Sequence, residues 1–385
     1  MAITILADLD GTLLPRPYTV QDNDSSSNDT ASPATPPAVV HPNLSEGPAY
    51  GPLVRLLDLG ATVVGITGSQ LATHRRRFFD DLPLEHRKAG RVLLAVQTGS
   101  QLYAPHPADG RPVRDEAFDA HLSRSNQSVR LDDDVVRELV EIGRRGLARF
   151  YDDLVTGSAT VDKDGPLGYL VPIAAKLRAD REAAGTDLAI RVPITDDGHQ
   201  LPRIEVRQNN SAVVFIGVPS SVGSDYFCVP DHLRPSVDGR PTGRNAFDCV
   251  PAGLDKSHVV RYLLRHRTDV MRRGRTVAMG GQPAGNDAGL TLWHTNNGTG
   301  QPAADDDDEI PFVSVSEREN MVPSRLKDCH VSTVPNAEGS AKVLIKLAEM
   351  LEGDATGRTM GDVSLCTHTV KEIVKKVNNA AYVSK

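Results

Sequence analysis

The chain has 385 residues, of which 39% are hydrophobic, and 43 basic against 50 acidic side chains give it a formal net charge of −7. This length and apolar content predict two domains, each with its own core. The mildly acidic balance argues against a nucleic-acid or membrane surface, because such surfaces need clustered Lys and Arg. A small anionic ligand would instead need a local basic pocket.

The N-terminal residues indicate a cytoplasmic location. An acid at Asp8 comes too early for the apolar region of a signal peptide, and no apolar run is long enough to span a membrane. The four cysteines are scattered without a Cys-x-x-Cys pair, which predicts reduced structural thiols and neither a disulfide scaffold nor a zinc site. The sequence leaves the oligomeric state open.

The first hundred residues alternate apolar runs with helical patterns. Three runs are predicted as buried strands: 2–8, 61–66 and 91–96. Leu53, Leu56 and Leu57, closed by Gly60, predict a helix between the first two strands, and a second helix is expected from Ser69 to Phe79. This order predicts a parallel sheet with polar groups at the carboxyl ends of its strands.

The middle of the chain has a different pattern. A long amphipathic helix around 135–150 and a shorter one at 173–184 precede three β-rich runs, 188–194, 201–208 and 211–218. Ile204 and Val206 alternate with charged neighbours, which predicts an antiparallel sheet with one wet face. The α/β pattern returns after Pro251 with a helix at 255–265, a strand at 276–279, and a strand and helix within 330–351. We therefore expect a core of 1–102 and 251–353, interrupted by an inserted domain at 103–250.

Three further segments complete the predicted organisation. Residues 21–44 are rich in Ser, Asp, Asn, Thr and Pro, which predicts a flexible loop. Residues 294–322 contain an acidic run, 305–309, which is typical of a solvated surface loop. Residues 354–385 are expected to form a C-terminal extension with a helix around 370–377.

The stretch Asp8-Leu9-Asp10-Gly11-Thr12 is the first candidate for chemistry. Two carboxylates two residues apart converge on one site only if the backbone turns sharply after the strand, as Gly11 permits. One carboxylate could then attack a substrate while the other transfers protons. Taken alone, the motif fits an ordinary acidic turn equally well. A calcium loop would need further oxygen ligands and a closing Glu.

Two later segments could bind phosphate. Thr67 and Gly68 follow the second strand and precede a helix, where a hydroxyl and free amides can hold phosphate oxygens. A purely structural capping role for Thr67 is the alternative. Lys256 opens the helix after the inserted domain and could neutralise both a phosphate and an attacking carboxylate. An exposed lysine without a role is the alternative there.

The last candidate is the Gly-rich turn from Met279 to Asp287. It follows a strand and ends in Asn286 and Asp287, and the carboxylate of Asp287 suits a hard cation. A turn of this composition also occurs without any ligand.

In their order and spacing these four elements resemble the haloacid dehalogenase superfamily of phosphatases, in particular its sugar-phosphatase-like branch with a large α/β cap of the C2 type. The resemblance implies a Rossmann-like parallel-sheet hydrolase core with an inserted α/β cap that contains an antiparallel sheet. It implies that Asp8 is the nucleophile and Asp10 the general acid and base. Further implied roles are phosphate or substrate binding by Thr67, Gly68, Lys256 and Asn286, and Mg²⁺ binding by Asp8, Asp10 and Asp287.

The resemblance also implies a function, although the chain departs from the family pattern in the fourth motif. It implies Mg²⁺-dependent hydrolysis of a phosphomonoester through an aspartyl-phosphate, with a small phosphorylated sugar or polyol as substrate. Relatives usually carry an acid directly after the glycine of the fourth motif, whereas this chain has Gly281 and Gln282 there. Two alternatives remain open: a phosphomutase or phosphotransferase acting on sugar phosphates, and a catalytically weakened protein that binds phosphate ligands. Arg203, Arg207 and Tyr226 are candidates for substrate contacts in the cap.

Overall fold

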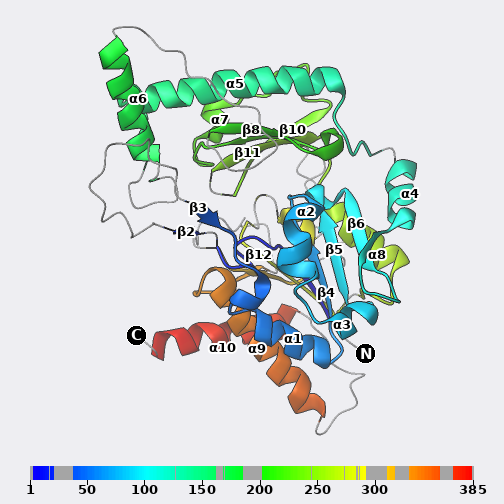
Figure 1. Cartoon of the computed structure of the whole chain (residues 1–385). Coiled ribbons are helices and arrows are strands. Elements are labelled where there is room, and N and C mark those ends of the chain that lie inside the picture. The colour runs from blue at the N-terminus through cyan, green and yellow to red at the C-terminus, as the bar shows by residue number, and fades with distance from the viewer. Residues whose placement is uncertain are drawn as a thin grey trace. The chain divides into compact units, whose positions relative to one another are not determined.

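The computed structural model describes residues 3–16, 18–20, 38–125, 127–161, 168, 170–184, 202–243, 245–272, 274–282, 285, 287–291, 310–316, 329–355 and 367–383. The chain divides into two compact units. The first contains Met1–His121 and Asp255–Lys385, and the second contains Leu122–Leu254. Figure 1 labels many of their helices and strands.

The first unit is built on an eight-stranded sheet with the order β14-β13-β12-β1-β4-β5-β6-β7. Six neighbouring strands are parallel: β14 (Cys329–Val331), β13 (Phe312–Ser314), β12 (Thr276–Gly280), β1 (Thr4–Ala7), β4 (Thr62–Ile66) and β5 (Val92–Val96). Beyond β5, two antiparallel strands extend the sheet: β6 (Gln101–Pro105) and β7 (Pro112–Arg114). Every residue of β1, β4, β5 and β12 is buried, so both faces of the central sheet are covered.

The position of β1 explains where a site can form. The chain runs from β1 outward through β4 and β5 on one side, then returns to build β12, β13 and β14 on the other. Ala7 is paired with Gly65 of β4 and with Met279 of β12. The residue after β1 therefore emerges at a topological switch point, where open parallel sheets leave a crevice beyond their carboxyl ends.

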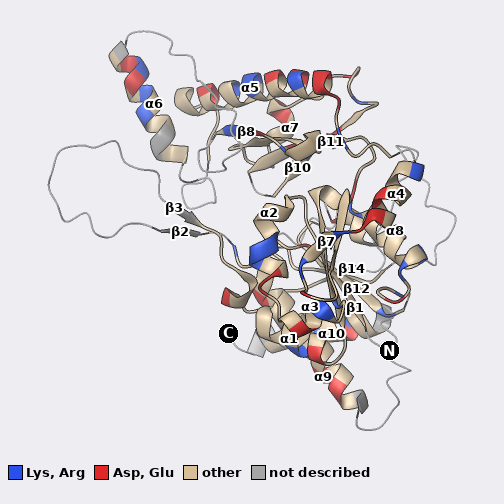
Figure 2. Ribbon diagram, turned by 45° about the vertical axis from the view of Figure 1, so that its right-hand side comes forward, with Lys and Arg blue, Asp and Glu red and all other residues tan. Residues whose placement is uncertain are grey.

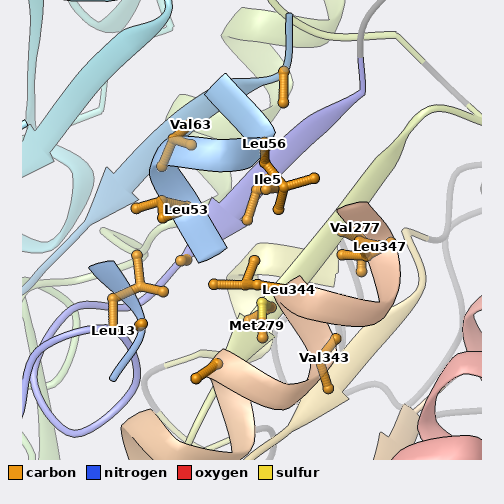
Figure 3. Packing of buried hydrophobic residues seen from close by; sticks show 14 of the residues in the cluster. Ile5, Leu13, Leu53, Leu56, Val63, Val277, Met279, Val343, Leu344 and Leu347 are labelled. Carbon is orange, nitrogen blue, oxygen red and sulfur yellow. The ribbon is translucent and has the colours of Figure 1, made fainter. Parts of the chain in front are cut away.

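One face of this sheet packs against three helices, α1 (Tyr50–Asp58), α9 (Asn336–Ala355) and α10 (Thr367–Val383). Figure 3 shows Leu53 of α1 and Leu344 of α9 close to Ile5 of β1. The other helical segments of this unit are η1 (Leu44–Glu46), α2 (Leu71–His74), η2 (Arg75–Phe79), α3 (Leu84–Lys88), η3 (Gln97–Gly99), α8 (Ser257–His266) and η5 (Ala288–Thr291). Helix α4 (Glu116–Arg124) crosses the boundary between the two units.

The second unit contains a four-stranded antiparallel sheet with the order β10-β11-β9-β8. Its strands are β8 (Arg203–Val206), β9 (Val213–Ile216), β10 (Val237–Thr242) and β11 (Ala246–Pro251). Helix α5 (Asp133–Thr156) buries Leu139 and Phe150 in one cluster with Ile204 and Phe215 of the sheet. Figure 2 shows acidic and basic residues along α5. The remaining helical segments are α6 (Leu170–Ala184), η4 (Gln208–Asn210) and α7 (Gly223–Tyr226).

The structure confirms the predicted fold class, a parallel-sheet core and a separate antiparallel sheet, and corrects several local predictions. Within the predicted loop 21–44, Ala38–Val40 form β3, which pairs with β2 (Tyr18–Val20), and Leu44 is fully buried. Within the predicted loop 294–322, Phe312–Ser314 form a buried strand of the core sheet. The first correction arises because β3 finds a pairing partner in β2, and the second because a short apolar run beside polar residues can still be buried.

Other boundaries also differ from the predictions. The predicted inserted domain begins at Tyr103, but that residue belongs to β6 of the core sheet, and the second unit begins at Leu122. Gln70, rather than Ser69, precedes α2. Strands β10 and β11 were not predicted from the sequence. The predicted strand at 188–194 and the acidic run 305–309 lie outside the described residues. None of the helices in the described parts of the chain is both long and apolar enough to cross a membrane.

Gly65 generates a prediction about the packing beside the switch point. A Cβ added there would lie 2.7 Å from the Phe78 ring and 2.9 Å from a methyl group of Leu9. We expect Gly65→Ala to lower the free energy of unfolding by about 1–3 kcal/mol, because the surrounding core has no room to accept the methyl group. Urea denaturation measures this change.

Gly51→Ala is the matched control. Gly51 lies in α1, and a Cβ added there would have no neighbouring atom within 4 Å, so alanine should leave stability unchanged or raise it slightly. Equal stabilities of the two variants would contradict the close packing of β4 against Leu9.

Candidate active site

The ammonium group of Lys256 joins two carboxylates from different ends of the chain. Its Nζ donates to Asp8 Oδ1 at 2.6 Å and to Asp287 Oδ1 at 2.7 Å. The Lys256 side chain is fully buried. Burial lowers the pKa of a lysine, but the two carboxylates outweigh it and raise the pKa of Lys256 above its ordinary value. Lys256 is therefore held as a cation between two acids.

Asp8 follows β1 directly and lies at the switch point of the sheet. Its backbone N–H donates to Met279 O at 3.0 Å, and the Thr12 hydroxyl makes a long contact of 3.4 Å with its Oδ2. Burial and the charge of Asp287 raise the pKa of Asp8 to about 7, against the lowering effect of Lys256. One ammonium group does not fully offset the charges of the two acids, and a further cation at this place would be stabilised.

Asp287 is held by the turn that follows β12. Its Oδ2 accepts the backbone N–H of Gln282 at 2.8 Å, and its side chain is 2% exposed. Gly280 makes this position possible, because a Cβ there would lie 2.5 Å from Asp287 Oδ2. The Gly-rich turn therefore places a carboxylate against the end of the strand. Asn286, the neighbouring candidate, lies outside the described residues.

Backbone packing fixes the segment that carries Lys256. A Cβ on Gly99 would lie 3.1 Å from Asp255 O, and one on Gly289 would lie 2.7 Å from Ser257 N. Asp255 Oδ1 accepts the backbone N–H of Ser257 at 2.8 Å, which satisfies a free donor at the start of α8. The two glycines thus allow η3 and η5 to approach the backbone around Lys256.

Thr67 and Gly68 follow β4, the neighbour of β1 in the sheet. The Thr67 hydroxyl is buried and accepts the backbone N–H of Ser69 at 3.1 Å, so it bonds within its own loop and does not cap α2, which begins after Gln70. Thr98 N–H donates to Thr67 O at 3.0 Å. Thr98 has a φ of 59°, an uncommon conformation for a β-branched residue. This segment fixes the loop after β4 at the same edge of the sheet as Asp8.

Asp10 lies two residues beyond Asp8, and two basic side chains hold its carboxylate. Arg77 Nη1 donates to Asp10 Oδ1 at 3.2 Å, and His74 Nε2 lies 3.0 Å from Asp10 Oδ2. Burial by itself raises the pKa of Asp10, but the His74 and Arg77 side chains outweigh it and hold that pKa well below its usual range. The two acids of the motif therefore have opposite electrostatic environments.

The sequence analysis missed His74 and Arg77. Both lie in the basic run His74–Arg77, which it treated only as part of a helix. Its candidates in the second unit have partners there: Arg207 Nε lies 3.4 Å from Glu205, and the Tyr226 hydroxyl donates to Asp153 at 3.0 Å. Arg203 lies 3.8 Å from Glu205 on the same strand.

The carboxylate oxygens of the site determine which kind of metal ion it could bind. Within the parts of the chain that the structure describes, no three His, Cys, Asp or Glu side chains are grouped so that they could hold one. The site offers the carboxylates of Asp8 and Asp287, which already share one cation. Carboxylate oxygens suit Mg²⁺, which usually binds one or two of them and completes its shell with water and phosphate oxygens. The residues present therefore fit a Mg²⁺ ion with few protein ligands.

Comparison with known proteins yields no matching family model and no matching curated protein. Solved structures similar to this chain include three enzymes. A haloacid dehalogenase-like hydrolase from Bacteroides thetaiotaomicron is 15% identical, with 92% of this chain and 99% of that chain covered and a TM-score of 0.40. The sucrose-phosphatase from Synechocystis sp. PCC6803, in complex with sucrose and phosphate, is 13% identical over 92% and 98%, with a TM-score of 0.38. The IMP-nucleotidase from Plasmodium falciparum is 10% identical, and 75% of this chain and 62% of that longer chain are covered, with a TM-score of 0.36.

These similarities are too distant to carry an argument about chemistry.

Proposed function

We propose that the chain is a Mg²⁺-dependent phosphatase in which Asp8 attacks a phosphomonoester and forms an aspartyl-phosphate. The observation that carries this proposal is the buried Lys256 ammonium, which joins Asp8 after β1 to Asp287 after β12. A lysine between two acids at the switch point of a parallel sheet provides a nucleophile, a fixed positive charge and a second carboxylate in one place.

The charges at the site explain why a metal ion belongs to the proposal. Two carboxylates and one ammonium sum to −1, and this charge would repel an incoming phosphate. Asp8, Asp287 and the backbone carbonyl of Asp10 would hold Mg²⁺. When bound, the ion offsets the charges of the phosphate and the carboxylates. Lys256 holds Asp8 Oδ1 and supplies the remaining positive charge from the protein itself.

The chain's own residues then divide the reaction between two carboxylates. An Asp8 oxygen attacks phosphorus, the bond to the leaving oxygen breaks, and Asp10 gives a proton to that oxygen as it takes the electron pair. In the second half-reaction Asp10 removes a proton from water while the water oxygen attacks phosphorus. The bond between Asp8 and the phosphoryl group breaks, which releases inorganic phosphate, restores the Asp8 carboxylate and leaves on Asp10 the proton that it gave up in the first half-reaction.

The substrate class is part of the proposal. We propose a small phosphorylated sugar or polyol, in line with the sequence resemblance to phosphatases that carry a large α/β cap. In support, an α/β unit with an antiparallel sheet is inserted between β7 and α8 of the core. We further propose a cytoplasmic location, and no nucleic-acid or membrane partner because the composition is mildly acidic.

The nucleophile proposal is tested by Asp8→Asn. An amide cannot form the aspartyl-phosphate, so we expect kcat on an aryl phosphate with Mg²⁺ present to fall by on the order of 10³-fold or more. The circular dichroism spectrum should stay that of the wild-type protein. Glu85→Gln, which removes an exposed acid from α3, is the control and should keep normal activity. Near-normal turnover by Asp8→Asn would show that another group attacks phosphorus.

The metal proposal is tested without any turnover by the pair Gly280→Ala and Gly281→Ala. A methyl group at Gly280 would collide with Asp287, whereas nothing lies within 4 Å of the corresponding position at Gly281. We expect Gly280→Ala to weaken Mg²⁺ binding by about 10- to 100-fold, since it displaces a proposed ligand. Isothermal titration calorimetry with MgCl₂ measures the affinity, and Gly281→Ala should match the wild-type protein. If both variants bind Mg²⁺ as tightly as the wild-type protein, Asp287 is not a ligand.

A further inference from the structure

The carboxylate of Asp10 has a separate basic partner for each of its oxygens. Arg77 Nη1 donates to Oδ1 at 3.2 Å, and His74 Nε2 lies 3.0 Å from Oδ2. Both partners come from one helical segment, because His74 ends α2 and Arg77 lies in the following η2. Arg77 is 67 residues from Asp10 in the sequence. Asp10 is thus bound at two points by a part of the chain that carries none of the proposed nucleophile, phosphate-binding or metal-binding residues.

The two partners are fixed inside the protein, whereas Asp10 is open. The His74 side chain is fully buried and the Arg77 side chain is 9% exposed, but the Asp10 side chain is 44% exposed. Arg77 Nε also donates to the backbone carbonyl of Pro42 at 3.1 Å, which holds the guanidinium in place. Arginine is almost never buried to this degree unless it is paired. The buried His74 and Arg77 side chains therefore hold a carboxylate that is itself partly exposed to solvent.

A structural role alone does not account for this arrangement. Burying a cation beside an acid gains little stability compared with apolar packing, because desolvation costs several kcal/mol per ion. Here two buried basic groups contact one partly exposed acid. The segment that supplies them ends in a π-helical turn, closed by Asp80 N donating to Arg75 O at 2.7 Å, and such turns frequently lie at functional sites.

The geometry assigns His74 and Arg77 as positioning residues, which hold in place the Asp10 carboxylate that the first half-reaction leaves, so that it can activate water in the second. An ionised carboxylate only accepts hydrogen bonds, and both Asp10 oxygens face basic groups. A general base must also lie within hydrogen-bond reach of the water in a fixed orientation. Lys256 holds Asp8 separately, so the nucleophile and the base have independent supports. This inference rests on the proposed phosphatase function.

Steady-state kinetics with p-nitrophenyl phosphate and Mg²⁺ test the inference. With this good leaving group, formation of the aspartyl-phosphate does not need an acid, so a misplaced Asp10 slows only its hydrolysis. We expect His74→Leu and Arg77→Met to lower kcat by about 10- to 100-fold and KM in the same proportion, with kcat/KM nearly unchanged. Acid-quenched samples of these variants should contain more phosphoenzyme than the wild-type protein. Arg77→Lys, which keeps the charge, should recover part of kcat.

The control is Arg76→Met, which removes an exposed arginine beside Arg77 and should leave kcat and KM unchanged. If Arg77→Met does not fold, Arg77→Lys is measured in its place and must show the same joint fall of kcat and KM in smaller measure. A fall in kcat with KM unchanged, or no fall at all, overturns the positioning role. Absence of any phosphatase activity in the wild-type protein, or full activity of Asp8→Asn, would instead refute the proposed function.

Discussion

The candidate site depends on one buried cation. Lys256 has no exposed side-chain surface, and burying an ammonium group costs several kcal/mol unless opposite charges surround it. Asp8 and Asp287 supply those charges, at 2.6 Å and 2.7 Å from its Nζ. The turn after β1, the turn after β12 and the start of α8 must therefore all be in place together. The interaction that stabilises this end of the core also aligns the proposed nucleophile.

The sheet order explains how residues so far apart meet. β1 lies at the centre of the sheet, and the chain builds one half of the parallel strands before the inserted unit and the other half after it. Asp8 and Asp287 follow two adjacent strands, and Thr67 follows the third. Gly65, Gly280 and Gly289 pack directly against neighbouring residues of the site region. A side chain at any of these glycines would push those neighbours away and change the spacing of the site residues. On the other side of the motif, His74 at the end of α2 and Arg77 in η2 hold Asp10.

The sequence predicts the features that depend on local pattern. Asp8, Thr67, Lys256 and Asp287 could be found because three of them follow apolar runs and one opens a helix, with glycines marking the turns. His74 and Arg77 could not, since a single helical pattern covers their segment and only long-range contacts, 67 residues apart in the case of Arg77, bring them to Asp10. β13 was missed because the strand is only three residues long, includes Ser314 and lies near a run of acids. Such elements are fixed by tertiary packing and not by local preference.

The central claim is that the phosphoryl group passes through Asp8. Mass spectrometry of acid-quenched Asp10→Asn protein, mixed with an aryl phosphate and Mg²⁺, tests it most directly, because loss of the proposed base should leave the intermediate intact. The account predicts one added phosphoryl group on the proteolytic peptide that contains Asp8, and none in the Asp8→Asn variant. A phosphoryl group on a different residue would contradict it. So would turnover by the wild-type protein with no phosphorylated peptide in either the wild-type or the Asp10→Asn sample.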